Sequence, residues 1–308
     1  MQDRNIGFIF AGQGAQKIRM GLDLYQNYKE AKAIYDVSDA DFDIKDVCFN
    51  GPIEKLNDTR YTQSAILLTS MAIARVLQTH HIVPKMVAGL SLGEYSALTY
   101  AGVLSLSDAL EIVTKRGQIM AQALSHNTTT MMAVLGLDID TIQEVCHQVA
   151  SVGVCEIANI NCPGQIVITG HKPALEMASK LLLERQARRV IPLSVSGAFH
   201  SSLLSDAASS LQQVLDLYHF NKPSIPVVFN YTGKVESHDF KSLLVKQIQS
   251  TVLFQDSIEH MIESGINCFV EIGPGSTLSG FVRKIDANIE VYHVENQASL
   301  NKLLEGLS

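Results

Sequence analysis

The chain has 308 residues, 46% of them hydrophobic and 18% charged, so it can bury a large core and is not expected to be disordered as a whole. At roughly 150 residues per domain, this length predicts two domains, or one large domain with an insertion. The formal net charge of −7 argues against nucleic acid as the main partner, because phosphate binding requires a basic face. No apolar run approaches the roughly 18 residues of a membrane span, so no membrane association is expected.

The first part of the chain alternates short apolar runs with amphipathic or apolar helical segments. In chain order, the pattern predicts a strand over 6–10, a glycine turn over 12–14, a helix over 62–78, a strand over 86–89, a helix from Ser91 to Leu98 and a helix with an apolar face over 106–120. The last of these helices is expected to begin near Ser105 or Ser107. This alternation is typical of an α/β domain.

The middle of the chain has a different pattern. It predicts a strand over 130–135, a helix over 138–150, strands over 154–161 and 165–169, a helix over 172–186 and a strand over 189–195. This β-α-β-β-α-β order is that of a ferredoxin-like unit. Further strands follow over 227–230, 268–272 and 291–293. We therefore expect one α/β domain, residues 1–126 and 197–308, interrupted by a small α+β domain at residues 127–196.

The cysteines indicate a reducing compartment. There are five of them, they are scattered, and no C-x-x-C pair occurs, so neither a disulfide framework nor a zinc site is predicted (Cys48, Cys146, Cys155, Cys162 and Cys268). Buried, reduced thiols in a cytosolic protein are the expected state, with no metal bound.

A candidate nucleophile lies at the junction of the second strand and the helix that follows it. Gly89-Leu90-Ser91-Leu92-Gly93 fits G-x-S-x-G in the strand–turn–helix context that this motif requires. Glycines on both sides allow a tight turn that projects the serine hydroxyl above the sheet edge. The amide of Leu92, at the helix N-terminus, would then point toward an oxyanion.

A serine nucleophile requires a base, and the chain has ten histidines. His200 is favoured by its position in the segment 196–202, where the chain returns from the predicted insertion on a loop. No Asp or Glu is marked by its position as a third member of a triad. A backbone or amide carbonyl could orient the imidazole instead.

Three other features leave alternatives open. The turn at Gly12-Gln13-Gly14 does not fit the dinucleotide-binding pattern G-x-G-x-x-G, because Lys17 stands where this pattern needs the third glycine. The turn is either an ordinary connection or the source of a second oxyanion amide, that of Gln13. Arg116, near the edge of an apolar helix face, is either solvated or a buried fork for a substrate carboxylate. The run 273–275 lacks the lysine of a P-loop and is interpreted as a structural turn.

Taken together, these residues resemble the malonyl-CoA:acyl-carrier-protein transacylases of type II fatty acid synthesis, over essentially the whole chain. Seven motifs occur in the order of that family: Phe10-x-Gly-Gln-Gly-x-Gln16, Thr62-Gln63, Gly89-x-Ser-Leu-Gly-Glu-Tyr95, Lys115-Arg-Gly117, Asn159-x-Asn-x-Pro-Gly-Gln165, Phe199-His200 and Glu271-Ile-Gly-Pro-Gly275. Each motif is weak alone, whereas seven in register are highly specific.

The resemblance implies roles for the candidate residues. Ser91 would be the nucleophile, His200 its general base and Arg116 the group that holds the free carboxylate of malonyl. The amides of Gln13 and Leu92 would form the oxyanion hole.

The resemblance also covers three further positions. Gln247 matches a glutamine whose neighbourhood helps orient the histidine, and Asn161 lies in a loop that faces the cleft. Phe199 resembles the variant found in malonyl-selective acyltransferases. One departure stands beside the nucleophile, because the family usually has histidine where this chain has Leu90.

The family further implies an α/β-hydrolase-like core with a mostly parallel sheet and a ferredoxin-like insert. It implies a cytoplasmic monomer without a bound cofactor, whose substrates are malonyl-CoA and phosphopantetheinylated acyl carrier protein. Because carrier proteins are acidic, Arg185, Arg188 and Arg189 are candidates for a docking patch, with a solvated helix end as the alternative. A polyketide malonyltransferase that acts in trans, a serine thioesterase or hydrolase, and a non-catalytic scaffold are the rival functions.

Overall fold

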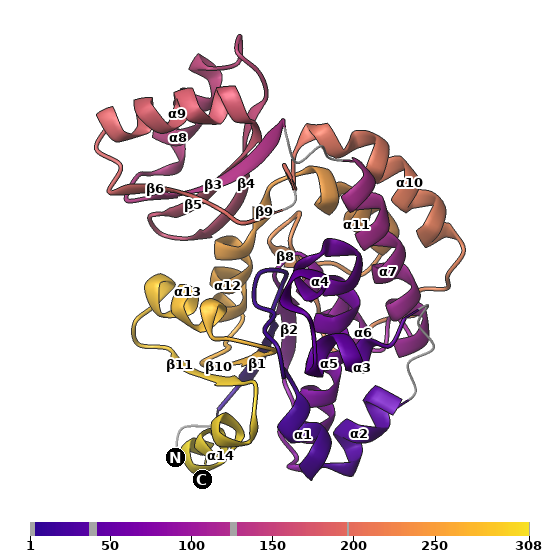
Figure 1. Ribbon diagram of the computed structural model, residues 1–308. Coiled ribbons are helices and arrows are strands. Elements are labelled where there is room, and N and C mark those ends of the chain that lie inside the picture. The colour runs from indigo at the N-terminus through magenta and orange to yellow at the C-terminus, as the bar shows by residue number, and fades with distance from the viewer. Residues whose placement is uncertain (1–3, 37–41, 124–127, 196, 308) are drawn as a thin grey trace.

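The computed structural model describes residues 4–36, 42–123, 128–195 and 197–307. Its larger part is built around a parallel sheet of four strands in the order β11-β10-β1-β2 (Figure 1). The strands are β11 (Glu290–Val294), β10 (Cys268–Ile272), β1 (Ile6–Phe10) and β2 (Met86–Gly89). All four agree with the predicted positions to within one residue at each end.

The register of these strands places three loops at one edge of the sheet. Phe10 pairs with Ile272 on one side and with Gly89 on the other, and all three residues end their strands. Because parallel strands run in the same direction, the segments that follow them meet at this carboxyl edge, where ligands bind in open α/β sheets. The glycine turn at 12–14, the serine turn at 89–93 and the turn at 273–275 therefore lie together.

Helices cover both faces of this sheet, as the alternating side chains of β1 require. Phe8 and Phe10 belong to a core shared with α5 (Thr59–Thr79), α6 (Leu92–Tyr100) and α7 (Leu106–Ala123). Ile9 points to the other face, into a core shared with α12 (Phe254–Glu263) and α13 (Thr277–Ile285). The remaining helices of this part are α1 (Leu22–Asn27), α2 (Lys29–Asp36), α3 (Ile44–Phe49), α4 (Ile53–Asn57), η1 (Ser202–Leu204), α10 (Ser205–Asp216), α11 (Phe240–Gln249) and α14 (Gln297–Leu307).

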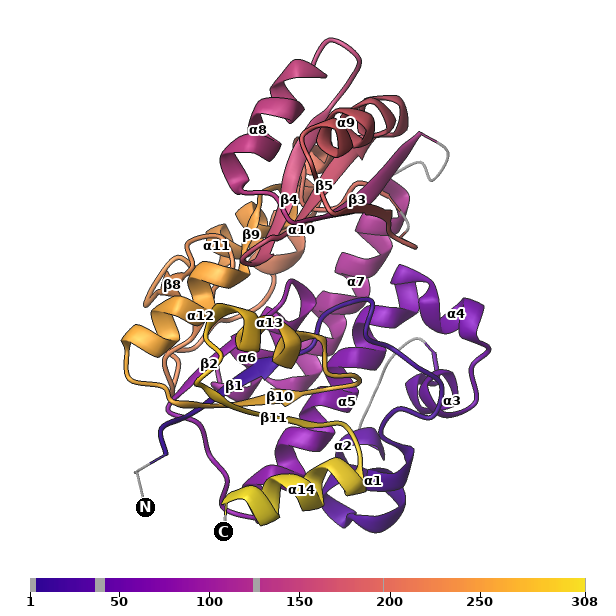
Figure 2. The ribbon, with the colours of Figure 1, turned by 90° about the vertical axis from the view of Figure 1, so that its left-hand side faces the viewer.

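The predicted β-α-β-β-α-β order is present in the middle of the chain. The elements are β3 (Thr129–Leu135), α8 (Ile139–Gln148), β4 (Cys155–Cys162), β5 (Gln165–His171), α9 (Lys172–Glu184) and β6 (Arg189–Pro192). The strands pair antiparallel in the order β6-β3-β5-β4. Figures 1 and 2 show this unit at one end of the molecule, with α14 at the other.

The second sheet is mixed, because a fifth strand joins it from outside that unit. β9 (Val252–Leu253) lies parallel to β4, with Asn159 opposite Val252. The two parts of the chain are thereby joined by sheet hydrogen bonds as well as by the two connecting segments. The inserted domain was expected to span residues 127–196. Residues 126, 127 and 196, at these boundaries, lie outside the described ranges, whereas residue 197 lies inside them.

Two predicted strands are shorter than expected: β6 ends at Pro192 instead of at residue 195, and the strand expected over 227–230 is reduced to two residues. Only Val228 and Phe229 form a strand, β7, which pairs with β8 (Lys234–Val235), and a single bridge from Val227 to Val87 links the segment to β2. The strand stops at Asn230 because the backbone N–H of this residue donates to Oε2 of Glu94 rather than to another strand. Within the described residues, no helix has both the length and the hydropathy needed to cross a membrane.

Candidate active site

Ser91 lies in a strained turn between β2 and α6. Its φ of 51° and ψ of −102° are values that non-glycine residues rarely adopt. The glycines on either side make the turn possible: a Cβ on Gly89 would lie 2.0 Å from the carbonyl carbon of Gly93, and one on Gly93 would lie 2.1 Å from the backbone oxygen of Phe10. The close approach of strand, turn and helix therefore requires glycine at both positions.

His200 is the histidine that meets this serine. Its Nε2 atom lies 2.8 Å from Oγ of Ser91, and its Nδ1 atom lies 2.8 Å from the backbone oxygen of Gln247. A carbonyl oxygen can only accept a hydrogen bond, so Nδ1 carries the proton and Nε2 presents its lone pair to the serine hydroxyl. In this tautomer the imidazole is arranged to accept the proton of Ser91.

The surroundings of His200 favour its neutral form. Burial, with a smaller contribution from the positive charge of Arg116, lowers the pKa of the imidazole from 6.5 to about 4. At neutral pH the ring is therefore unprotonated and able to act as a base.

Arg116 is a buried fork beside the serine. The residue is only 1% exposed, and its guanidinium lies over the ring of Tyr95, 5.2 Å from the centroid. Nη1 donates to the side-chain oxygen of Gln63 at 2.8 Å, while Nη2 donates to Oγ of Ser91 at 3.3 Å. A buried guanidinium next to a nucleophile is suited to a carboxylate carried by the substrate.

Gln247, in α11, contacts all three of these residues. Its side-chain oxygen accepts from Nη2 of Arg116 at 3.1 Å, and its Nε2 donates to the backbone oxygen of Ser91 at 2.9 Å. Its own backbone oxygen accepts from His200. One residue thus fixes the arginine, the serine turn and the histidine relative to one another.

These groups open onto a cavity of about 420 Å³ between the two sheets. Among the predicted residues, Gln13, Arg116, Ser91, His200, Asn161 and Phe199 all line it. The side-chain oxygen of Asn161 is buried and has no hydrogen-bond partner within the described part of the chain. Buried polar atoms are normally paired, so this oxygen is available to a ligand in the cavity.

The two predicted oxyanion residues flank the serine from different segments. Leu92 is the first residue of α6, so its amide is among the unpaired N–H groups at the helix N-terminus. Gln13 belongs to the glycine turn after β1, and its side chain is tied to Oγ1 of Thr59 by a 2.9 Å hydrogen bond. The turn is also held close by Gly12, where a Cβ would lie 2.3 Å from the backbone oxygen of Leu90.

Three further residues belong to this site and had no role predicted from the sequence. They are Asn230, whose side chain bonds to the serine turn, Glu94 and Gln63. All three are fully buried polar residues. Two signals were present: Gln63 stands in the Thr62-Gln63 motif at the start of a largely buried helix, and Asn230 ends an apolar run, where strands carry functional groups.

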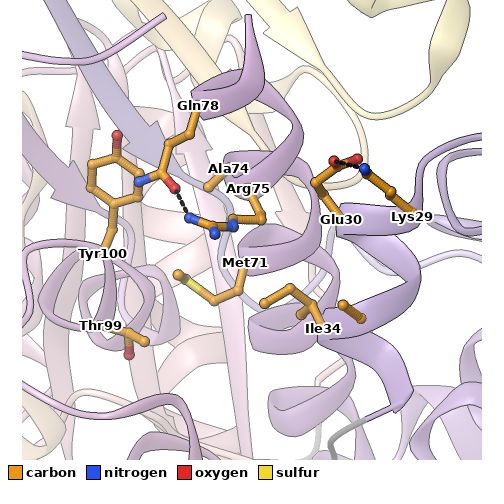
Figure 3. Close-up of a pocket in the computed structure, with 10 residues that line it drawn as sticks. Lys29, Glu30, Ile34, Met71, Ala74, Arg75, Gln78, Thr99 and Tyr100 are labelled. Carbon is orange, nitrogen blue, oxygen red and sulfur yellow. Dashed lines mark hydrogen bonds and ion pairs between the residues drawn. The ribbon is translucent and has the colours of Figure 1, made fainter. Parts of the chain in front are cut away.

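A second cavity, of about 630 Å³, lies between α2, α5 and α6, and none of the predicted site residues lines it (Figure 3). Its wall combines apolar side chains such as Met71 and Ile34 with the exposed Arg75, which donates to Gln78 at 3.0 Å. The predicted site residues therefore do not reach this cavity.

The chain is similar to known proteins over nearly its whole length. Residues 7–300 match the family model described as acyl transferase domain. The malonyl CoA-acyl carrier protein transacylase of Bacillus subtilis is 40% identical over 307 residues, which cover 98% of this chain and 97% of that protein.

Solved structures show the same similarity. The crystal structure of malonyl CoA-acyl carrier protein transacylase from Clostridium perfringens superposes with a TM-score of 0.96 at 41% identity, covering 98% of this chain and 97% of that one. A second structure is a malonyl-transacylase in complex with its type II polyketide-synthase acyl carrier protein, with a TM-score of 0.91, 35% identity and coverage of 98% and 99%.

Proposed function

The chain belongs to the acyl transferase family, as an [acyl-carrier-protein] S-malonyltransferase, and we propose that Ser91 and His200 are the residues with which it transfers malonyl from malonyl-CoA to acyl carrier protein. The observation that carries this assignment is the hydrogen bond of 2.8 Å between Oγ of Ser91 and Nε2 of His200, at the floor of the cavity between the sheets. This is the geometry of a nucleophile and its base.

The first half-reaction forms an ester on the serine. Nε2 of His200 takes the proton of Oγ while Oγ attacks the thioester carbon of malonyl-CoA, which gives a tetrahedral oxyanion. The C–S bond then breaks, and the coenzyme A sulfur leaves with the proton held by His200. Malonyl remains on Ser91.

The second half-reaction reverses these roles. The phosphopantetheine thiol of the carrier protein gives its proton to His200 and attacks the malonyl-serine ester. The bond between the carbonyl carbon and Oγ breaks, and His200 returns the proton to Ser91. The enzyme is regenerated without a metal or a bound cofactor in the proposed mechanism.

The amides of Gln13 and Leu92 are the proposed oxyanion donors in both half-reactions. They come from the turn after β1 and from the first residue of α6, which meet at the carboxyl edge of the parallel sheet. Removing one such donor typically lowers the rate about 10²–10³-fold. Their positions therefore depend on the close packing of the two turns.

Arg116 is the proposed malonyl-selecting group. The hydrogen bonds to Gln63, Ser91 and Gln247 occupy three of the five N–H donors of its guanidinium, so donors remain for the free carboxylate of malonyl. Acetyl-CoA lacks this carboxylate and would gain nothing from the arginine. Selection then comes from a charge pair formed in a water-poor site.

Asn161 and Phe199 are the proposed contacts for the rest of the acyl-pantetheine unit. The unpaired side-chain oxygen of Asn161 can accept from an amide N–H of the pantetheine arm. Phe199, next to His200 and largely buried, reduces the space for a methyl group on the α-carbon of the acyl chain. We predict that methylmalonyl-CoA is turned over much more slowly than malonyl-CoA.

The finer description of the fold and the setting belongs to the same proposal. We describe the four-stranded part as an α/β-hydrolase-like core and residues 127–196 as a ferredoxin-like insert, supported by the strand order β6-β3-β5-β4. The proposal further includes that the protein is a cytosolic monomer and that Arg188 and Arg189 contact the acidic carrier protein. Arg185 contributes less, because it is paired with Glu144.

The test is intact-protein mass after brief exposure to malonyl-CoA, with acetyl-CoA and the Ser91→Ala variant in parallel. We expect one malonyl adduct on the native protein, little acetyl adduct and none on Ser91→Ala. Adding phosphopantetheinylated acyl carrier protein should discharge the adduct onto the carrier. Release of free coenzyme A and malonate without an adduct would instead support a hydrolase.

A further inference from the structure

The side chain of Asn230 bridges the two ends of the serine turn. Its Oδ1 accepts a hydrogen bond of 2.6 Å from the backbone N–H of Ser91, and its Nδ2 donates one of 2.6 Å to the backbone oxygen of Gly89. The residue is fully buried. The bridge therefore spans the point where β2 ends and α6 begins, without competition from water.

Asn230 is itself held from both sides. Its backbone N–H donates to Oε2 of Glu94 at 2.6 Å, and its backbone oxygen accepts from the N–H of Leu253 at 2.8 Å. Glu94 lies in α6, three residues after the nucleophile, and Leu253 ends β9, which pairs with the second sheet. The backbone N–H, the backbone oxygen, Oδ1 and Nδ2 of Asn230 thus each take part in a hydrogen bond. These bonds give the side chain one defined position.

The serine turn needs such a support. The φ of 51° at Ser91 is unfavourable for a residue with a Cβ, and strained conformations persist only where the surrounding structure holds them. The bridge also uses the N–H of Ser91, which is thereby turned away from the role of oxyanion donor. The amide of Leu92 is left as the donor that the turn contributes.

We propose that Asn230 is a positioning residue that holds Ser91 in the conformation required for attack, and that Glu94 acts through it. The inference rests on the proposed role of Ser91 and extends it to two residues that need not touch the substrate. The juxtaposition of Gly89, Ser91 and Glu94 around one buried amide carries it.

The main test is the single-turnover rate of malonyl-serine formation in Asn230→Ala, followed by intact-protein mass over a range of malonyl-CoA concentrations. We expect the maximal rate to fall about 10²-fold, as for a displacement of about 1 Å at a reacting group. The half-saturating concentration should change little, because the cavity wall that binds the substrate is not altered. Glu94→Ala should reduce the rate too, and the double variant should be no slower than Asn230→Ala, because the two residues act as one unit.

A conservative variant separates positioning from folding. In Asn230→Asp, the neutral carboxyl can still donate to the oxygen of Gly89 and accept from Ser91, whereas the ionised form repels that oxygen. Glu94 of α6 and, beyond Ser91, His200 and Arg116 are the titratable or charged groups around it. We expect the rate relative to the native enzyme to approach one at low pH and to fall as the pH rises. The native rate measured at each pH corrects for His200.

Asn267→Ala is the matched control. Oδ1 of Asn267 also accepts a backbone hydrogen bond, from the N–H of Asn5 at 2.8 Å, but the residue precedes β10, at the end of the sheet opposite to the serine turn. It should lose stability and keep its acylation rate. Equal rates for native enzyme and Asn230→Ala, or a pH-independent ratio for Asn230→Asp, would overturn the inference alone. Absence of an adduct on the native enzyme would overturn the proposed function and this inference with it. Should Asn230→Ala fail to fold, Asn230→Asp decides.

Discussion

The Nδ1 atom of His200 lies 2.8 Å from the backbone oxygen of Gln247, where a Ser-His-Asp triad would have a carboxylate. A carbonyl fixes the tautomer of the imidazole as a carboxylate does, but it brings no negative charge to stabilise the protonated ring. Arg116 adds a nearby positive charge that disfavours protonation further. The histidine is thus oriented as a base but kept neutral by its surroundings.

The first prediction concerns pH. Because the pKa of His200 is lowered to about 4, the base is in its active form well below neutrality. We expect the single-turnover rate of serine acylation to stay on its plateau from pH 7 to pH 5 and to fall as the pH drops through about 4. Stopped-flow or quenched-flow acylation measures this profile. An inflection near the ordinary value of 6.5 in the native enzyme would contradict it.

The second prediction concerns acyl selectivity. Arg116→Ala should lower kcat/KM for malonyl transfer by about 10²-fold or more, the usual cost of losing one partner of a buried charge pair, and should change acetyl transfer far less. Arg116→Lys should recover only part of the malonyl activity, since an ammonium cannot form the fork. Parallel assays with malonyl-CoA and acetyl-CoA measure the difference. Equal losses with both substrates would refute a carboxylate-binding role.

The third prediction concerns the packing of the serine turn. In Gly93→Ala, the new Cβ would lie 2.1 Å from the backbone oxygen of Phe10, which cannot move without disturbing the sheet. We expect the free energy of unfolding to fall by about 3 kcal/mol, the upper end of the range for overpacking. Urea denaturation measures the change.

Gly280→Ala serves as the matched control for this variant. Gly280 lies in α13, where an added Cβ meets no atom within 4 Å. Alanine should therefore stabilise the protein by roughly 0.5–1 kcal/mol through the lower entropy of the unfolded chain. A similar loss in both variants would show that the contact with Phe10 does not set the result, because helix propensity alone favours alanine at both positions.

Much of the fold could be predicted because its signals are local. Apolar runs that end at or just before glycine mark β1 and β2. In the middle unit, two segments with helical periodicity stand between the strands. β9 could not be found in this way, since Val252 and Leu253 become a strand only by pairing with β4. The short length of β7 was missed for a similar reason: Asn230 leaves the ladder to bind Glu94, which is distant in sequence.

The same contrast between local signals and contacts of distant segments applies to the candidate site. Ser91 was identifiable because its motif forces a local turn. His200 was favoured by its position on the loop that returns from the insertion, and the resemblance gave the roles of His200 and Arg116. The burial of Arg116 was undecidable from its position near the edge of a helix face. The bonds of Asn230 join segments more than 130 residues apart, and no spacing rule reports such a contact.

The fourth prediction concerns carrier docking. Arg188 and Arg189 are exposed, and Arg188 packs beside Gly136. The N–H of Gly136 donates to the backbone oxygen of Gly164, and the next residue, Gln165, lines the cavity between the sheets. Arg189→Glu should raise the KM for acyl carrier protein several-fold at low salt, with the difference shrinking as salt is added. Arg75→Glu, at the cavity of Figure 3, is the control with the same charge change and should leave this KM unaltered. A salt-independent KM in Arg189→Glu would remove the arginine from the docking surface.

The fifth prediction concerns Leu90, where the family usually has histidine. The side chain is partly buried and packs against the apolar cluster of Ile9, Phe281 and their neighbours. In Leu90→His, a polar ring would replace these contacts, and we expect a loss of roughly 1–3 kcal/mol in the free energy of unfolding. The acylation rate should change little, because the proton passes between Ser91 and His200, which are already 2.8 Å apart. Urea denaturation and single-turnover acylation on the same preparation measure the two effects. A large rise in rate would show instead that an imidazole at this position assists the reaction and that Leu90 limits the native enzyme.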